Sequence, residues 1–181
     1  MGWCDEQRWP PPIVDPACER ELLAACIVNP SASPLAAEKL SADDFGVPLH
    51  GRIFQAVTDV LADGKKPDEF MLDNKLRGEP AYDSAGGLHF LIEITGSGFS
   101  LARVSAIDGL AESVKTNALR RRICQTLNSA QKRSEDPLQT VGEQITDLRE
   151  SVTRLEDESE TSQRGMIHVA ERGNSARFSR G

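Results

Sequence analysis

The sequence predicts an all-α protein: an orthogonal helical bundle followed by a long antiparallel helical hairpin. Three observations predict this class. Apolar residues recur at helical spacing along most of the chain, proline and capping residues repeatedly stand where helices would begin, and the second half carries an uninterrupted heptad pattern. We expect four parts: an extended arm (1–14), a globular helical bundle (15–100), a helical hairpin for dimerisation (101–157) and a disordered basic tail (158–181).

Composition and charge narrow the function classes. The 181 residues carry 21 Lys and Arg against 28 Asp and Glu, a formal net charge of −7. Nonspecific DNA binding needs a basic face, so we expect weak or no direct DNA binding. No apolar run approaches the roughly twenty residues of a membrane span. The four cysteines include no Cys-x-x-Cys pair, which indicates reduced thiols in a cytoplasmic protein without a metal site.

Start signals predict the first helices. Residues 1–14 have no periodicity and include three consecutive prolines, which indicates an extended arm. Asp15 followed by Pro16 is typical of an N-cap and a first helical residue, and Asn29-Pro30 ends that helix. Ser33-Pro34 repeats the start signal for a short second helix.

The stretch Asp43–Asp68 holds the helix around which we expect the bundle to be organised. Pro48 suits a first turn, and Gly64 suits a left-handed C-cap. The Asp43-Asp44 pair is interpreted as a cap rather than as an acid–base pair. A broad apolar stripe predicts packing against at least two other elements, and its members are Ile53, Phe54, Val57, Val60 and Leu61.

Two further helices are predicted before residue 100. Phe70 to Leu76 suggests a short helix that ends at Gly78 and Pro80. The segment Asp83–Thr95 is ambiguous, because Phe90–Thr95 is short and apolar enough for a strand. We favour a helix, since a lone strand would have no partner in this chain.

The hairpin is predicted from two long helices joined by a turn near Ser134–Asp136. The first runs from about Ala102 to about Lys132, and Asp136-Pro137 starts the second. Apolar residues of the second alternate at spacings of three and four, as in a coiled coil. This seam is longer than one antiparallel partner covers, so we expect a dimer. The predicted interface residues are Leu119, Ile123, Leu127, Leu138, Val141, Ile145, Leu148, Val152 and Leu155.

Chemistry-bearing motifs are not found in the sequence. It has no Gly-x-x-x-x-Gly-Lys-Ser/Thr loop for a triphosphate, no Gly-x-Gly-x-x-Gly and no Gly-x-Ser-x-Gly. His50 and His89 lie in predicted helices and are interpreted as packed or surface residues. Arg120–Arg122 is interpreted as solvated or interhelical. We therefore expect no catalytic, cofactor-binding or metal-binding residues. The alternative that the protein is an enzyme would require a catalytic motif that these patterns do not include.

Four separated signatures occur in order along the chain: Pro11-Pro12 with Glu21-Leu22-Leu23, Asp44-Phe45 with a following His50, Gly86-Gly87 with Phe90, and Arg121-Arg122. Together they resemble the N-terminal (collar) domain of the DnaB-type replicative DNA helicase, over about Pro11 to Glu156. The resemblance marks eight family-motif core residues: Phe45, His50, Ile53, Phe54, Gly86, Gly87, Phe90 and Leu91. Gly46 and Gly51 stand where the family has a large aromatic residue and an arginine, a change expected to weaken a surface contact.

The resemblance implies a DNA-replication scaffold. In that family the domain dimerises through its hairpin, three dimers form a ring, and the ring docks the primase C-terminal domain. The ATPase motor that uses ATP and Mg is expected to be absent from this chain, which would then perform no chemistry. The alternative is a stand-alone adaptor or inhibitor that binds a full-length replicative helicase or a primase.

Overall fold

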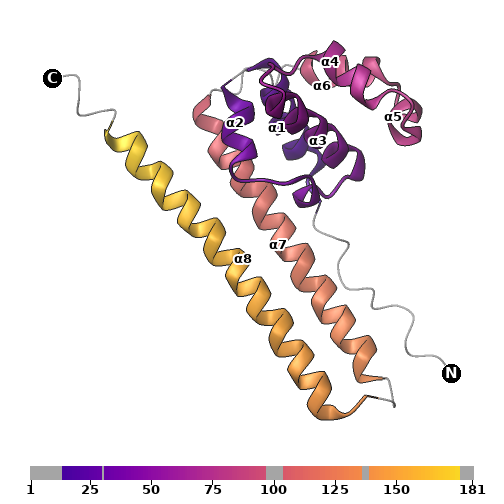
Figure 1. The fold of residues 1–181 in the computed structure, drawn as a ribbon, viewed down its shortest axis with the longest axis vertical. Coiled ribbons are helices and arrows are strands. Elements are labelled where there is room, and N and C mark those ends of the chain that lie inside the picture. The colour runs from indigo at the N-terminus through magenta and orange to yellow at the C-terminus, as the bar shows by residue number, and fades with distance from the viewer. Residues whose placement is uncertain (1–13, 30, 97–103, 136–138, 176–181) are drawn as a thin grey trace. The chain divides into compact units, whose positions relative to one another are not determined.

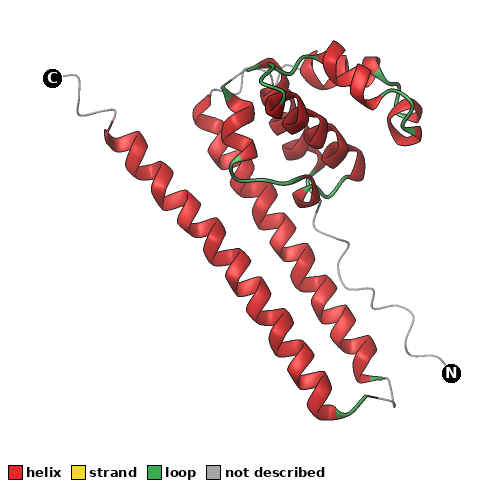
Figure 2. Cartoon of the chain, in the orientation of Figure 1, coloured by secondary structure: helices red, strands yellow, loops and turns green. Residues whose placement is uncertain are grey.

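The computed structural model describes residues 14–29, 31–96, 104–135 and 139–175, and within these ranges it contains helices and loops but no strand (Figures 1 and 2). The predicted all-α class is confirmed. The elements are α1 (Pro16–Val28), α2 (Ala32–Ala37), the 3₁₀ turn η1 (Ala42–Asp44), α3 (Pro48–Ala62), α4 (Glu69–Leu76), α5 (Pro80–Ser84), α6 (Leu88–Gly96), α7 (Val104–Ser134) and α8 (Val141–Ser175).

Contacts divide the chain into two units, Met1–Ala118 and Leu119–Gly181, which we call the bundle unit and the hairpin unit. The division lies later than the predicted boundary at 100 and 101, because the first half of α7 belongs to the bundle. Its apolar side chains are buried there, and they are Ile107, Ala111, Val114 and Ala118.

Helix α3 is central to the bundle unit, as the sequence predicts. It packs against α1, α2, η1 and α4. Its stripe is buried at Ile53, Phe54, Val57 and Val60, because neighbours cover it on several sides. Pro48 opens the helix, and Gly64 follows its C-cap with φ of 71°, a left-handed conformation that glycine adopts without strain.

Local signals explain the other ends of the bundle helices. The Asp15 carboxylate accepts a hydrogen bond from the Cys18 backbone N–H at 3.0 Å, which confirms the predicted cap of α1. Helix α2 begins at Ala32, two residues earlier than predicted, and takes Pro34 into its first turn, where a missing N–H costs nothing. Helix α5 was not predicted.

The ambiguous segment before residue 96 forms helix α6, and the preference for a helix over a strand is confirmed. Gly86 and Gly87, with φ of 109° and 58°, make the turn that precedes it. Phe90, Leu91 and Ile94 are buried on one side of α6. The helix packs against α1 and α4, so its apolar content is explained by core packing.

Helix α8 begins and ends later than the sequence predicts. It starts at Val141 rather than at Asp136-Pro137, because Thr140 and Glu143 form a capping box: the Thr140 N–H donates to the Glu143 carboxylate at 2.9 Å, and the Glu143 N–H donates to the Thr140 hydroxyl. Its backbone stays helical to Ser175. The predicted disordered tail from residue 158 is therefore wrong up to that point. Residues 1–13, Leu138 and 176–181 lie outside the described residues.

Candidate protein–protein interface

The hairpin unit exposes most of the apolar side chains that the heptad pattern singled out. On α8 the exposed fraction runs from 38% for Leu148 to 70% for Val141, and Ile145 and Val152 lie between these values. On α7, Ile123 and Leu127 are also close to half exposed. A group of exposed apolar side chains on an otherwise charged helix pair indicates a protein–protein interaction site.

The two arms of the hairpin meet mainly through polar and small side chains. Ion pairs cross between them, among them Arg122 to Glu158 at 2.7 Å and Arg133 to Asp147 at 3.3 Å. The Gln144 amide also donates to the Arg133 carbonyl oxygen at 2.9 Å. We call the half-buried residues on this side the arm-to-arm residues: Leu119, Arg122, Thr126, Ala130 and Arg133 on α7, and Gln144, Asp147, Ser151, Leu155 and Glu158 on α8.

The ion pairs also fix the register of the arms. They lie eleven residues apart on α7, from Arg122 to Arg133, and eleven apart on α8, from Asp147 to Glu158. Eleven residues are close to three helical turns, so both pairs fall on the same stripe of each helix. The arms therefore stay antiparallel in one register along this length (Figure 1).

Helical geometry places the exposed apolar side chains of both arms on one side of the hairpin. Successive helix residues are rotated by about 100°, so a residue that follows an arm-to-arm residue points sideways. In antiparallel arms this sideways direction is the same for both helices. The second helix runs in the opposite direction and also faces in the opposite direction, and these two reversals cancel. We call the resulting surface the hairpin face, made of Ile123, Leu127, Ile145, Leu148 and Val152.

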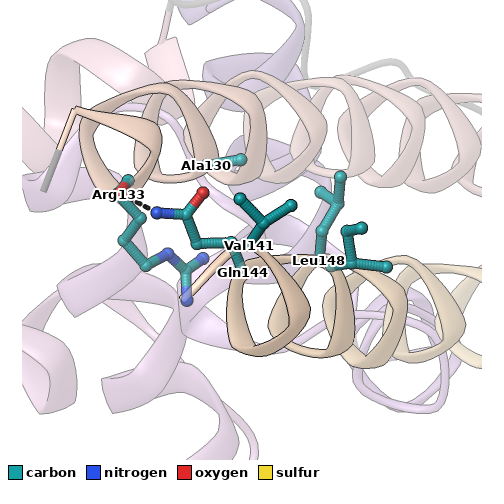
Figure 3. Close-up of a pocket in the computed structure, with 6 residues that line it drawn as sticks. Ala130, Arg133, Val141, Gln144 and Leu148 are labelled. Atoms are coloured by element: carbon teal, nitrogen blue, oxygen red, sulfur yellow. Dashed lines mark hydrogen bonds between the residues drawn. The ribbon is translucent and has the colours of Figure 1, made fainter. Parts of the chain in front are cut away.

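A hollow lies at one end of the hairpin face, near the turn. Its volume is about 170 Å³, and its walls come from α7 and α8 of the hairpin unit. Figure 3 shows Val141, Gln144 and Leu148 pointing from α8 toward the arm that carries Ala130 and Arg133. The lining residues are Ala130, Arg133, Val141, Gln144, Ile145 and Leu148.

The predicted interface residues thus divide into groups. Ile123, Leu127, Ile145, Leu148 and Val152 form the hairpin face, and Val141 adjoins it at the hollow. Leu119 and Leu155 are half-buried arm-to-arm residues. Leu138 lies outside the described residues. Arg120–Arg122, interpreted as solvated or interhelical, takes part in a cross-arm ion pair through Arg122.

The family-motif core residues lie in the bundle unit instead. Six of them are buried, and they pack the helices rather than form a site: Phe45, His50, Ile53, Phe54, Phe90 and Leu91. The rings of Phe45 and Phe54 are 5.0 Å apart, and the His50 ring is stacked 6.4 Å from that of Phe90. Gly86 and Gly87 serve the turn before α6.

His50 is part of a buried polar cluster that sequence reasoning did not find. Its Nδ1 lies 2.8 Å from the Glu19 carboxylate, and both side chains are almost fully buried. Glu19 also accepts hydrogen bonds from the backbone N–H groups of Gly46, at 2.6 Å, and Val47, at 3.2 Å. This carboxylate on α1 therefore holds the backbone that leads into α3 and contacts His50 in the first turn of that helix.

A second buried carboxylate joins η1 to α7. Asp44 is inaccessible to solvent and accepts from the Ser41 N–H at 2.9 Å in a capping box of η1. The predicted cap of the organising helix is not formed, because the N-cap of α3 is Val47 and has no side-chain cap. The Lys115 ammonium lies 2.9 Å from the same carboxylate. The lysine lies 71 residues further along the chain, so no local pattern could have predicted this pair.

Gly51 corrects one expectation drawn from the family resemblance. It is a buried position rather than a surface one, because a Cβ atom there would lie 2.5 Å from the Ala42 carbonyl oxygen. The neighbouring η1 backbone thus passes directly over α3 at this residue. A side chain such as arginine would require η1 to move.

Reactive and ligating groups are sparse among the described residues. No group of three or more His, Cys, Asp or Glu in that part of the chain is arranged to hold a metal ion. Burial raises the pKa of the Cys26 thiol to about 12, so this thiol is neutral at physiological pH. No helix in the described ranges is long and apolar enough to cross a membrane.

Comparison with known proteins gives the family. Residues 12–115, more than half of the chain, match the family described as the DnaB-like helicase N-terminal domain. This chain belongs to that family. A crystal structure of the N-terminal domain of DnaB helicase from Mycobacterium tuberculosis has the same fold, with a TM-score of 0.70 and 20% identity, over 80% of this chain and 99% of that one.

Three relatives place the match within longer proteins. The chain is 37% identical over 86 residues, 48% of its length, to the replicative DNA helicase DnaB of Treponema pallidum (strain Nichols). It is 27% identical over 83% of its length to DnaB of Rhodothermus marinus and over 94% to the replicative DNA helicase DnaC of Bacillus subtilis (strain 168). The aligned regions span 20, 15 and 34% of these relatives, respectively.

Proposed function

We propose that this DnaB-like N-terminal domain is a scaffold for replicative helicase assembly and that it self-associates through the hairpin face. The observation that carries the proposal is the row of exposed apolar side chains shared by both arms. Because these side chains are already about half buried, covering one of them stabilises an assembly by roughly half of the 1.5–3 kcal/mol that complete burial contributes, before the entropy of association is subtracted. The assembly unit is a dimer, and three dimers form a ring.

The proposed partners follow from the family. The chain docks the C-terminal domain of a primase and co-assembles with full-length replicative helicase. The scaffold itself acts without a cofactor, and ATP with Mg serves the motor domain of the family. Its acidic charge favours protein partners over DNA, because binding to a phosphate backbone needs a basic surface.

Matched substitutions on α8 test self-association. Val152 belongs to the hairpin face, whereas the adjacent Thr153 is exposed and points away from it. Val152→Asp is expected to give a monomer, because a buried unpaired carboxylate costs several kcal/mol. Thr153→Asp is expected to leave the dimer intact. Light scattering over a range of protein concentrations measures both, and a monomeric unmodified chain at high concentration contradicts the proposal.

The partner proposal needs its own experiment. Added chain is expected to slow DNA unwinding by a full-length replicative helicase in a concentration-dependent way, because mixed rings contain fewer motors. Val152→Asp should abolish the effect and Thr153→Asp should preserve it. Gel filtration with the primase C-terminal domain tests docking separately. Unchanged unwinding together with the absence of any complex on gel filtration would eliminate both proposed partners.

A further inference from the structure

The bundle unit also exposes large apolar side chains outside its core. Phe70 on α4 is 68% exposed, and Ile92 on α6 is 48% exposed. Phe70 lies two positions before the buried Leu72, and Ile92 lies two positions after the buried Phe90. Two positions correspond to a rotation of about 200°, so both side chains point away from the core. We call Phe70 and Ile92 the bundle patch.

The bundle patch lies on neighbouring helices and close to the start of α1. Helix α6 packs against both α1 and α4, so it stands between them. On the α1 side, the Arg20 guanidinium lies 5.5 Å from the centre of the Phe90 ring and 4.0 Å from the Glu93 carboxylate. Arg20 is only about 6 Å along the helix axis from Pro16. The chain therefore enters α1 one helix away from Ile92 and two helices away from Phe70.

The segment that leads to this point is rich in aromatic residues. Residues 1–13 contain both tryptophans of the chain, Trp3 and Trp9, and the run Pro10-Pro11-Pro12 joins Trp9 to α1. An indole ring presents a large apolar surface together with one polar N–H group. Such rings match exposed apolar side chains such as those of the bundle patch.

The length of the segment allows each tryptophan to reach one member of the bundle patch. At the 3.1 Å rise of a polyproline helix, the five steps from Trp9 to Val14 span about 16 Å. The eleven steps from Trp3 to Val14 span up to about 36 Å in an extended chain. Axes of packed helices are about 8–10 Å apart, so Trp9 reaches α6 and Trp3 reaches α4.

Charges follow the same order along the segment and across the bundle. The basic pair Arg8-Trp9 is nearer to α1, and Ile92-Glu93 on α6 offers an exposed carboxylate. The acidic stretch Trp3–Glu6 is farther from α1, and the exposed Lys65-Lys66 pair stands just before α4. Opposite charges at both contacts favour one placement of the segment, on α6 first and on α4 second.

We propose that residues 1–13 of this chain fold back on their own bundle unit and cover the bundle patch, with Trp9 against Ile92 and Trp3 against Phe70. The segment is then an intramolecular strap that ties α6 and α4 to the start of α1. This inference is independent of the proposed self-association, which uses the hairpin face.

Tryptophan fluorescence tests the strap directly, because both tryptophans belong to it. Trp3→Phe leaves Trp9 as the reporter, and Trp9→Phe leaves Trp3. Each reporter is expected to emit at a shorter wavelength than in a free peptide of residues 1–13, because packing removes the indole from water. Ile92→Asp should shift the Trp9 emission to the peptide value, and Phe70→Asp should do the same for Trp3. Emission equal to that of the peptide before either Asp substitution would overturn the strap.

Val28→Asp is the matched control for these substitutions. Val28 is 46% exposed, as Ile92 nearly is, but it lies about 18 Å along α1 from Pro16, at the far end of that helix. It should leave both emissions unchanged. Circular dichroism checks that each variant keeps its helices. A response to Val28→Asp as large as the response to Ile92→Asp would overturn the assignment of the bundle patch.

Dilution and a monomeric variant decide which copy supplies the strap. The shift in emission should be independent of protein concentration and should persist in Val152→Asp, because the strap and the bundle patch belong to one chain. A shift that disappears on dilution or in Val152→Asp would assign the segment to a second copy. That result would overturn the intramolecular strap and leave the proposed self-association standing.

The native Cys4 gives an independent measurement, because it lies in the strap. Asn74 is exposed on α4 one helical turn after Phe70. In a chain with Cys124→Ser, Asn74→Cys is expected to form a disulfide with Cys4 at least about 10-fold faster than Val28→Cys does, since a bound strap raises the effective concentration. Mass spectrometry of the digested chain measures both rates. Equal rates, or disulfides between two copies in place of the internal one, would overturn the inference.

Discussion

The bundle unit and the hairpin unit use apolar residues in opposite ways. In the bundle, Ile53, Phe54 and Val57 of α3 are completely buried, because α1, α2, η1 and α4 surround that helix. In the hairpin, Ile145 and Val152 of α8 remain about half exposed. Both helices carry apolar stripes at helical spacing. An apolar stripe therefore specifies an amphipathic helix, and the number of neighbouring helices decides whether the chain itself buries the apolar face.

The two units also differ in how deeply they bury their polar contacts. The bundle buries the carboxylates of Glu19 and Asp44 and satisfies them with backbone N–H groups and a cation. The cross-arm pairs Arg122–Glu158 and Arg133–Asp147 of the hairpin are only partly buried, so water reaches them. Buried pairs fix the arrangement of the bundle helices, whereas the exposed pairs of the hairpin set register at little energetic gain.

Matched isoleucines give the largest expected contrast. Ile53→Ala removes a fully buried side chain and is expected to lower the free energy of unfolding by about 2–5 kcal/mol. Ile145→Ala removes a half-exposed one and is expected to change it by less than about 0.5 kcal/mol in the monomer. Urea unfolding at low protein concentration measures both. Equal losses would mean that the hairpin face is covered within the monomer.

Loss of the buried Glu19 carboxylate tests the bundle cluster. Glu19→Ala leaves two backbone N–H groups and His50 without their acceptor and is expected to cost about 3 kcal/mol of stability. Glu19→Gln keeps an acceptor and should cost less. Glu21→Ala, on the same helix and less buried, is the control and should have a small effect. Thermal unfolding of the three variants checks the order.

Double-mutant cycles compare one ion pair from each unit. The coupling between Asp44 and Lys115 is expected to be about 1–3 kcal/mol, since the carboxylate is inaccessible to water. The coupling between Arg133 and Asp147 is expected to stay below about 1 kcal/mol and to fall with added salt, because both side chains are more than a third exposed. A hairpin coupling as large as that of the bundle would contradict this comparison.

The smallest expected effect is the acid response of the α8 cap. The Thr140 backbone N–H and hydroxyl lower the pKa of Glu143 from its ordinary 4.5. A lowered folded-state pKa means that this stabilisation is present above pH 4.5 and is lost as the pH falls through the folded value. NMR titration should show the first turn of α8 fraying only there. Thr140→Val, which removes the hydroxyl, should raise the Glu143 pKa, and an unchanged pKa would exclude this cap.

Local signals explain how much of the fold the sequence predicts. Asp15 with Pro16, Pro48 with Gly64, and Gly86-Gly87 mark helix ends through backbone chemistry that acts within a few residues. The start of α8 was misplaced because the Thr140–Glu143 capping box competes with the Asp136-Pro137 signal. The helix beyond residue 158 was missed because polar composition was interpreted as disorder, although residues such as Glu, Gln and Arg are good helix formers.

By itself, the sequence determined the helices of this DnaB-like domain and the residues that form its apolar stripes, because helical period and capping depend on nearby residues. Tertiary structure alone decided which stripes are covered. It joined Glu19 to His50 and Asp44 to Lys115, required glycine at position 51, and turned Ile123, Leu127, Ile145 and Val152 outward together. These outcomes depend on which helices become neighbours, and that is set by the summed packing of the whole chain rather than by any local pattern.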